Sequence, residues 1–306
     1  MIFVVLPRVE ILDFAGPLQA FSEANRSRER YRIRICSTRP RIESDQGVVL
    51  SDLEPLPENI GDALVVVPGM PYASTERVER KVTRWLADVA RNGAHVASVC
   101  TGAFVLGEAG LLEDKRCTTH WSRTSELARR FPRARVLEDR LYITDGAITT
   151  SAGIASGIDM ALALIEQADG PIVAAEIARE MVVYLRRDGA QEQSSVYLDY
   201  RTHLHPGVHR VQDWIVRNPA ARTTLAALAD IAGMSARSLT RSFRGATGIS
   251  VLAFTTRVRL ELARTLMHDP GLTMDAVARK CGMSARQLRR LFDFEHRVRI
   301  RTRDSS

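Results

Sequence analysis

The chain has 306 residues, enough for about two domains of ordinary size. Hydrophobic residues make up 45% and charged residues 26%, which is typical of globular proteins and excludes a disordered or fibrous chain. The net charge of +7 is unevenly distributed: residues 207–306 contain 18 Lys and Arg against 8 Asp and Glu, whereas residues 1–206 contain 25 against 28. A basic last third indicates a module for a polyanion such as nucleic acid, although a solvated basic surface would have the same composition.

The four cysteines have no C-x-x-C spacing, so we expect neither a disulfide framework nor a structural zinc site. Residues 1–6 are apolar but have no basic leader or cleavage site, and no apolar run approaches the roughly 18 residues of a membrane span. No glycine-rich phosphate loop and no cluster with metal-ligand spacing is present. We therefore expect a cytoplasmic protein with no membrane segment, metal or cofactor.

The first two-thirds of the sequence alternate between short apolar runs and helical stretches. This alternation predicts a covered, mostly parallel α/β sheet. The expected strands are residues 2–6, 31–36, 63–67 and 95–99, with a hairpin within 141–150. The expected helices are residues 13–25, 76–91, 103–111, 153–167 and 172–186.

Cys100 stands at the turn between the strand at 95–99 and the helix that follows it. Such a turn projects its residue from the carboxyl edge of the sheet, and a helix N-terminus favours a thiolate, as in a nucleophile elbow. Asp13 and Gly69 also follow strands, so we expect them at the same edge. Asp13 would accept a proton or orient a ligand, and Gly69 would bring a backbone N–H close. A buried cysteine without a chemical role fits the spacing equally well.

Residues 1–185 resemble the DJ-1/PfpI superfamily, a branch of the class I glutamine-amidotransferase-like fold. Cys100 falls at the elbow cysteine of that family, and Asp13, within LDFAGPLQAF, falls at its acidic site residue. The P-G at 68–69 and the T-T-H-W at 118–121 are similar to those of members fused to AraC-type domains. The resemblance implies a flavodoxin-like sheet with helices on both faces. It also implies a ligand site at Asp13, Gly69, Cys100, Thr101 and His120.

Residues 225–243 and 274–292 form an internal repeat, offset by 49 residues and identical at 10 of 19 positions. Each copy has a short apolar helix, a glycine (Gly233 or Gly282), a serine suited to an N-cap, and a second helix. This is the pattern of a helix-turn-helix. The stretches 208–217 and 250–268 predict a leading helix and a rigid connector that would hold the copies about one duplex turn apart.

The second helix of each copy has an apolar face and a basic face. In the first copy Leu239 and Phe243 lie four residues apart on the apolar side. Arginines on the other side suit contacts with guanine edges or phosphates in a major groove, whereas a solvated face of a small bundle is the competing interpretation. The predicted DNA-contacting residues are Arg237, Thr240, Arg241, Arg286, Arg289 and Arg290.

Residues 207–293 resemble the paired helix-turn-helix domain of the AraC-type transcription regulators, which implies an all-α double helix-turn-helix domain after a linker at 186–206. After Phe292 that family usually continues with Gly-x-x-Pro-x-x-Tyr-Arg and a closing helix. Here residues 294–306 form an atypical basic tail without glycine, proline or tyrosine. Its arginines would add nonspecific phosphate contacts, or its unusual sequence would leave the regulator defective.

Together the two resemblances match the domain order of GlxA-type regulators. They imply a sequence-specific DNA-binding regulator of transcription whose first domain senses a small metabolite. The implied partners are double-stranded DNA, an amino-acid-like or amine effector, RNA polymerase and a second copy of the chain in a homodimer.

The alternative function is an isonitrile hydratase-like or amidase-like enzyme that uses Cys100 with Asp13 and Thr101, carried on a DNA-binding tail. Thr101 stands where the protease-like members have a histidine directly after the elbow cysteine, so the thiol lacks an adjacent base. An enzyme is therefore the less favoured reading. A base role for His120 and a redox role for Cys100 stay open.

Overall fold

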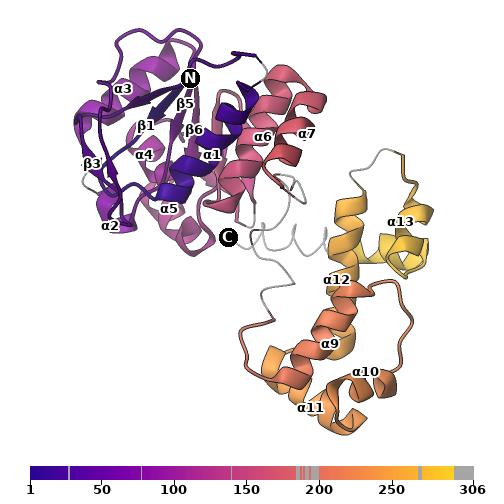
Figure 1. Ribbon diagram of the computed structural model, residues 1–306. Coiled ribbons are helices and arrows are strands. Elements are labelled where there is room, and N and C mark those ends of the chain that lie inside the picture. The colour runs from indigo at the N-terminus through magenta and orange to yellow at the C-terminus, as the bar shows by residue number, and fades with distance from the viewer. Residues whose placement is uncertain are drawn as a thin grey trace. The chain divides into compact units, whose positions relative to one another are not determined.

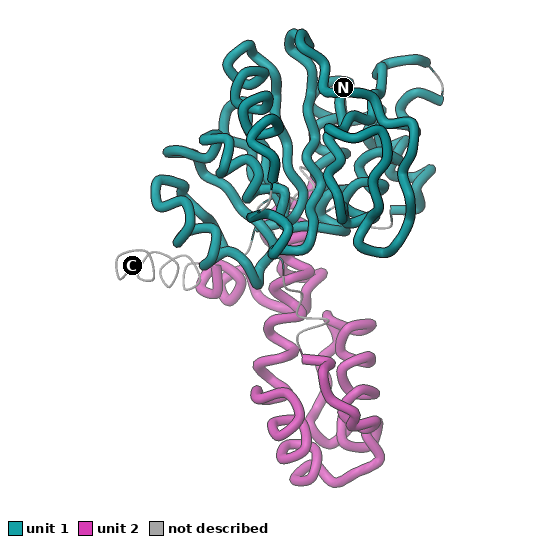
Figure 2. Tube along the Cα trace, turned by 90° about the vertical axis from the view of Figure 1, so that its left-hand side faces the viewer, with its two compact units in different colours: residues 1–193 teal, residues 194–306 magenta. Residues whose placement is uncertain are grey.

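A computed structural model describes residues 1–26, 28–76, 78–138, 140–183, 187, 189, 193, 200–267 and 271–292. The predicted tail at 294–306 lies outside these residues, as does part of the predicted linker at 186–206. The chain divides into two compact units, residues 1–193 and 194–306, coloured teal and magenta in Figure 2. No helix in the described ranges is both long enough and apolar enough to cross a membrane.

The first unit is built on a six-stranded sheet with the order β2-β1-β5-β6-β10-β9. Five strands are parallel, and β9 closes one edge antiparallel to β10. The parallel strands, taken in chain order, give the order 2-1-3-4-5 of flavodoxin-like folds. The predicted mostly parallel sheet and its hairpin are confirmed. The bounds are β1 (Ile2–Val4), β2 (Arg34–Cys36), β5 (Leu64–Val67), β6 (His95–Val99), β9 (Tyr142–Asp145) and β10 (Ile148–Ser151).

Helices cover both faces of this sheet, as Figure 1 shows. Side chains alternate between the faces along each strand, so Val4 and Val65 join a core with α3 (Arg80–Arg91) and α4 (Gly102–Glu108). Phe3 and Val66 point the other way and pack with a second group of helices. Because both faces are buried, the central strands β1 and β5 are apolar throughout. The second group is α1 (Ile11–Ala24), α6 (Ala155–Asp169) and α7 (Pro171–Glu180).

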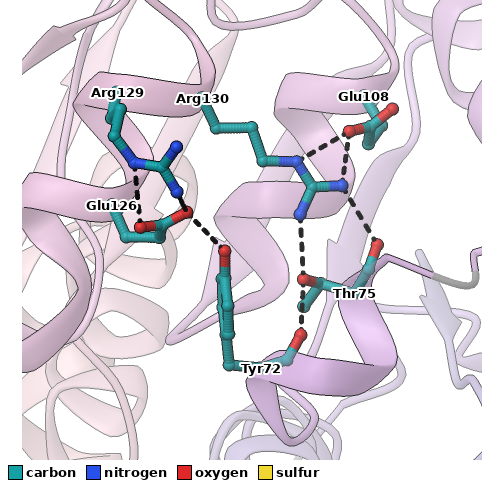
Figure 3. Close-up of polar contacts among 6 residues, drawn as sticks. All are labelled: Tyr72, Thr75, Glu108, Glu126, Arg129 and Arg130. Atoms are coloured by element: carbon teal, nitrogen blue, oxygen red, sulfur yellow. Dashed lines mark hydrogen bonds and ion pairs between the residues drawn. The ribbon is translucent and has the colours of Figure 1, made fainter.

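Arg130 ties together three helices on the α4 side of the sheet (Figure 3). It belongs to α5 (Thr124–Arg130), and its guanidinium donates to Glu108 of α4 at 2.9 and 2.5 Å. It also donates to the hydroxyl and carbonyl oxygens of Thr75, in α2 (Tyr72–Thr75), at 3.3 and 3.5 Å. The neighbouring Arg129 pairs with Glu126, one turn earlier on its own helix. Arg130 therefore anchors α2 and α5 to the helix that follows the elbow cysteine.

Several elements are shorter than the sequence predicts: the strand expected at 2–6 ends at Val4, the helix expected at 76–91 begins only at Arg80, and the helix expected at 103–111 ends at Glu108. Two further elements are shorter for local reasons. The strand expected at 31–36 begins only at Arg34, because the Asn25 side chain bonds both the N–H and the carbonyl of Tyr31. The helix expected at 172–186 ends at Glu180, and Val182 has a positive φ of 54°, which a helix cannot accommodate. Residues 184–186 of that prediction lie outside the described residues. The remaining short strands pair as β3 (Ile42–Glu43) with β4 (Val49–Leu50) and β7 (Arg116–Cys117) with β8 (Arg135–Val136).

The described part of the second unit is helical, and both predicted helix-turn-helix copies are confirmed. Gly233 and Gly282 adopt the same left-handed φ of 68°, which ends the first helix of each copy. Ser235 and Ser284 then cap the second helices by accepting a backbone N–H at 3.2 Å. The helices are α9 (Pro206–Arg217), α10 (Leu225–Ala232), α11 (Ala236–Thr247), α12 (Val251–Leu266), α13 (Met274–Lys280) and the helical residues 285–292.

The helix α12 belongs to two separate cores. Its first half contributes Phe254 and Val258 to a core with α9, α10 and α11. Its second half contributes Leu260 and Ala263 to a core with α13 and Leu288. The predicted connector is therefore a shared structural element of both copies.

Candidate functional site

Cys100 sits in a strained turn at the carboxyl edge of the sheet. It lies between the end of β6 and the start of α4, with a φ of 56° that non-glycine residues rarely adopt. Its N–H donates to the Ser151 carbonyl at 2.9 Å, and its own carbonyl accepts the Thr119 hydroxyl at 2.8 Å. Contacts on both sides thus hold the Cys100 backbone in the elbow conformation.

Asp13, in the first turn of α1, lies beside this thiol and is fully buried. Its Oδ1 accepts the N–H of Ile154 at 2.7 Å, whereas Oδ2 is buried without a hydrogen-bond partner in the described residues. A Cβ added at Gly69 would lie 2.3 Å from that Oδ2 and 3.0 Å from both the Cys100 Cβ and the Thr101 Oγ1. Four predicted site residues therefore meet around a position that only glycine can occupy.

The electrostatics of the pair oppose ionisation of the thiol. Burial raises the pKa of Asp13 to about 6. The hydrogen bond from the Ile154 N–H lowers the pKa but only partly offsets the effect of burial. Burial, and next the negative charge of Asp13, raise the pKa of the Cys100 thiol far above its usual range. The sequence-based expectation of a thiolate does not hold, because these two effects outweigh the first turn of α4. At neutral pH the site holds a protonated thiol beside a largely ionised carboxylate.

Thr101 positions the neighbouring loop. Its buried hydroxyl accepts the Met70 N–H at 2.8 Å and donates to the Met70 carbonyl. Both of these bonds go to backbone just after β5, so the hydroxyl holds the loop of Gly69 against the elbow.

His120 is not joined to Cys100 by any hydrogen bond between described atoms. Its Nδ1 bonds with the Ser122 hydroxyl at 2.8 Å, and its ring lies 5.5 Å from that of the exposed Trp121. The preceding Thr119 is the residue that contacts the Cys100 backbone. The geometry favours a capping role for His120, whose ring accepts the Ser122 N–H at the start of the 3-10 turn η1 (Trp121–Arg123).

Sequence reasoning missed the loop that follows β10. A Cβ added at Gly153 would lie 2.9 Å from the Cys100 Sγ, and Ile154, with a φ of 32°, supplies the N–H to Asp13. The position of this loop in the sequence could have indicated its role. Residues 152–154, Ala-Gly-Ile, follow a strand parallel to β6, so the loop lies at the same edge of the sheet as Cys100.

All six predicted DNA-contacting side chains are exposed, opposite the buried faces of their helices. In α11 the apolar side, Leu239 and Phe243, is completely buried, and in the second copy Leu288 takes the same place. Arg244 adds an exposed arginine to α11 that was not predicted, because it lies just beyond the repeated motif.

The loop between α9 and α10 joins the two copies. Arg259 of α12 donates to the Pro219 carbonyl at 2.7 Å and to the Ala221 carbonyl at 2.9 Å. The turn of the second copy reaches the same loop, because a Cβ at Gly282 would lie 2.6 Å from the Ala220 carbonyl oxygen. These contacts fix the second copy against the first.

Known families match both units. The DJ-1/PfpI family matches residues 1–167, and a helix-turn-helix domain matches residues 228–299. The HTH-type transcriptional regulator CdhR of Pseudomonas aeruginosa is 30% identical over 92% of this chain and 84% of its own length. The regulator GlxA of Rhizobium meliloti is 26% identical over 92% of this chain and 88% of its own. The isonitrile hydratase of Pseudomonas putida is 29% identical over only 55% of this chain and 71% of its own. The chain therefore belongs to the DJ-1/PfpI family, in the group of HTH-type transcriptional regulators that join this domain to a helix-turn-helix domain.

Proposed function

We propose that the chain is a cytoplasmic transcription regulator that reads double-stranded DNA with both helix-turn-helix copies and responds to a small polar effector. The observation that carries the DNA-binding part is the row of exposed arginines on each second helix, set opposite an apolar face that packs into the core of its copy. Arg237, Thr240 and Arg241 would contact one major-groove segment, and Arg286, Arg289 and Arg290 the next.

The effector site we propose is the cluster of Asp13, Gly69, Cys100 and Thr101. The Oδ2 of Asp13 is buried and forms no hydrogen bond of ordinary geometry with a described residue, although the Cys100 thiol and the Gly69 backbone lie close enough to lower the pKa of the carboxyl. A pKa of about 6 leaves it mostly ionised at neutral pH. A ligand that brings an ammonium or amide N–H would satisfy it, which supports an amine or an amino-acid-like molecule. Asp13, Gly69 and Thr101 are buried and Cys100 is only partly so, so a ligand would approach the cluster from the side of Cys100.

The test of DNA reading is footprinting of the full chain on the DNA upstream of its own gene, with competitor DNA at near-physiological salt. We expect protection of two adjacent major-groove segments. Arg241→Ala should weaken specific binding by about 1–3 kcal/mol and relax base choice. Arg217→Ala, at an exposed arginine at the end of α9, is the matched control and should leave the footprint intact. Unchanged specific affinity in Arg241→Ala would remove the recognition-helix assignment.

The opposite outcome is a footprint that is absent or smeared, both without ligand and with amine and amino-acid ligands. That result would support a regulator made defective by its atypical tail. We further propose that the chain acts as a homodimer and recruits or obstructs RNA polymerase. Light scattering of the purified chain tests the first statement, and in vitro transcription on the footprinted DNA tests the second. An effector that regulates must bind the DNA-competent and DNA-incompetent states with different affinity.

The second candidate function is an isonitrile hydratase-like or amidase-like activity at Cys100, which the grouping of Asp13, Cys100 and Thr101 favours. The raised pKa of the thiol and the separate hydrogen bonding of His120 weigh against it. Incubation with an alkyl isonitrile and with a primary amide tests it directly. Turnover that disappears in Cys100→Ala while DNA binding persists would establish the enzyme.

A further inference from the structure

The second unit contains a cavity of about 590 Å³ between α9, α10, α11 and α12. It lies in the DNA-binding unit and shares no residue with the Cys100 cluster. Two side chains that line it, Leu225 and Leu252, are 41% and 74% exposed, although they are large and apolar. Apart from Ala221, the apolar part of the lining is Trp214, Ile215, Leu225, Leu228, Val251 and Leu252.

The charged residues of the lining are all positive. Arg222 and Arg259 line the cavity, and no aspartate or glutamate among the described residues does. Arg259 is half-buried and donates to the Pro219 and Ala221 carbonyls, which orient its guanidinium without neutralising it. Arg222 is exposed, and its charge adds to that of Arg259. A cavity with an apolar wall and two arginines that form no ion pair with any described residue is complementary to an anion that carries a hydrocarbon group.

We propose that this cavity is a binding site for an amphipathic organic anion, a carboxylate attached to an alkyl or aromatic group. The carboxylate would pair with Arg222 and Arg259. The hydrocarbon would lie against Trp214 and the two exposed leucines, removing their apolar surface from water. The volume suits a small ligand of this kind, because ligand pockets commonly span about 300–1,000 Å³.

A ligand in this cavity would also affect DNA binding, a consequence that rests on the proposed function. Thr240 lines the cavity and stands on α11 among the residues proposed to contact DNA. An anion held beside α11 would repel the phosphates of a bound duplex and neutralise Arg222. Ligand would therefore lower the affinity for DNA, and DNA would lower the affinity for ligand by the same factor.

The first experiment is isothermal titration of the full chain with octanoate, octan-1-ol and octyltrimethylammonium, in the absence of DNA. The three probes share a chain length and differ in head-group charge. We expect octanoate to bind at least about fivefold more tightly than either of the others. Equal affinity for the three would overturn the proposal, because a purely apolar surface does not distinguish them.

Variants then locate the site. Leu252→Glu places a negative charge at the mouth of the cavity, in a first helical turn where an acidic residue is favourable, so the variant should fold. We expect Leu252→Glu to bind octanoate at least about tenfold more weakly than Leu252→Gln, its neutral match. Arg222→Ala should weaken binding about fivefold, and Arg217→Ala, outside the cavity, should leave it unchanged. Wild-type affinity in both Leu252→Glu and Arg222→Ala would show that octanoate binds elsewhere and would refute the site.

The last measurement separates this proposal from the proposed function. Octanoate is added to the chain bound to its footprinted DNA, and the expected result is a fall in DNA affinity that Leu252→Glu no longer shows. A chain that binds octanoate in the cavity but no DNA would retain the ligand site and refute only the regulator. Octanoate binding in the cavity with unchanged DNA affinity would refute the coupling.

Discussion

Gly282 lies directly against Ala220, so closely that a Cβ atom at Gly282 would stand 2.6 Å from the Ala220 carbonyl oxygen and 2.7 Å from its Cα. Gly282 belongs to the turn of the second helix-turn-helix, and Ala220 to the loop before the first. Arg259 bonds the residues on either side of Ala220. This short loop, together with the shared helix α12, thus sets the position of the second copy relative to the first.

The two equivalent glycines of the repeat offer a matched test of this contact. Both have a φ of 68°, but a Cβ at Gly233 would meet only the end of the Arg210 side chain, at 3.6 Å. Gly233→Ala should therefore cost only the backbone strain, about 1 kcal/mol of unfolding free energy. Gly282→Ala should cost about 1–3 kcal/mol more, because it also collides with backbone. Urea unfolding of the two variants measures both, and equal losses would mean that the contact with Ala220 does not constrain the fold.

The buried carboxyl of Asp13 should give the chain a distinctive pH dependence. Its pKa rises from 3.8 to about 6 on folding, so the folded chain holds a proton that the unfolded chain has released between those values. The free energy of unfolding should then fall as pH rises from about 4 to 6, by about 3 kcal/mol in total, and stay level above. Asp13→Asn keeps an acceptor for the Ile154 N–H but cannot ionise. The variant should therefore be more stable than the wild-type chain at neutral pH.

Urea titrations between about pH 4 and pH 7 test this, with Asp62→Asn, at an exposed aspartate, as control. The control should keep the wild-type slope in this range. A slope for Asp13→Asn as steep as that of the control would contradict the assignment to Asp13.

The Cys100 thiol should react slowly with iodoacetamide. Its raised pKa leaves little thiolate at about pH 8, and only the thiolate attacks. Asp13→Asn removes the neighbouring negative charge, lowers the pKa of the thiol and should speed alkylation about tenfold for each unit of the change. Peptide mass spectrometry over time gives the rate, and Cys100→Ser identifies the modified peptide. Reaction of wild-type Cys100 as fast as a free cysteine peptide would show an activated thiol and revive the enzyme candidate.

Arg130 and Arg129 are adjacent in sequence but should differ in their effect on stability. The Arg130 side chain is 21% exposed and bonds to two other helices, whereas Arg129 is 75% exposed and pairs within its own helix. Arg130→Ala should lower the free energy of unfolding by about 1–3 kcal/mol. Arg129→Ala should leave it unchanged within error, because exposed pairs contribute little. Chemical denaturation measures the free energy of unfolding of both variants. Similar losses in the two would show that the hydrogen bonds of Arg130 to α2 and α4 do not stabilise the fold.

Local patterns account for the parts of this structure that could be predicted. The elbow at Cys100 follows from a strand and a helix that adjoin in sequence, and the turns at Gly233 and Gly282 follow from one repeated motif. The periodicity of residues 250–268 likewise predicted α12, within a few residues at its end.

The parts that could not be predicted depend on contacts between distant segments. Asp13 and Ile154 are 141 residues apart, and nothing in the pattern around either residue indicates the hydrogen bond between them. The prediction of a thiolate at Cys100 was wrong for the same reason. Burial by segments distant in sequence raises the pKa of the thiol by more than the adjacent helix lowers it. The contact of Gly282 with Ala220 is absent from the repeat itself, since Gly233 has no equivalent neighbour.

Because α12 contributes side chains to the cores of both helix-turn-helix copies, the two copies cannot evolve as separate units. A chain cut after Leu266 would leave Leu260 and Ala263 without the partners that now bury them, and a chain that began within α12 would do the same to Phe254 and Val258. Neither copy can be inherited alone with its core intact. The exposed faces of α11 and of residues 285–292 belong to neither core, so their sequences can diverge while the two copies are retained together.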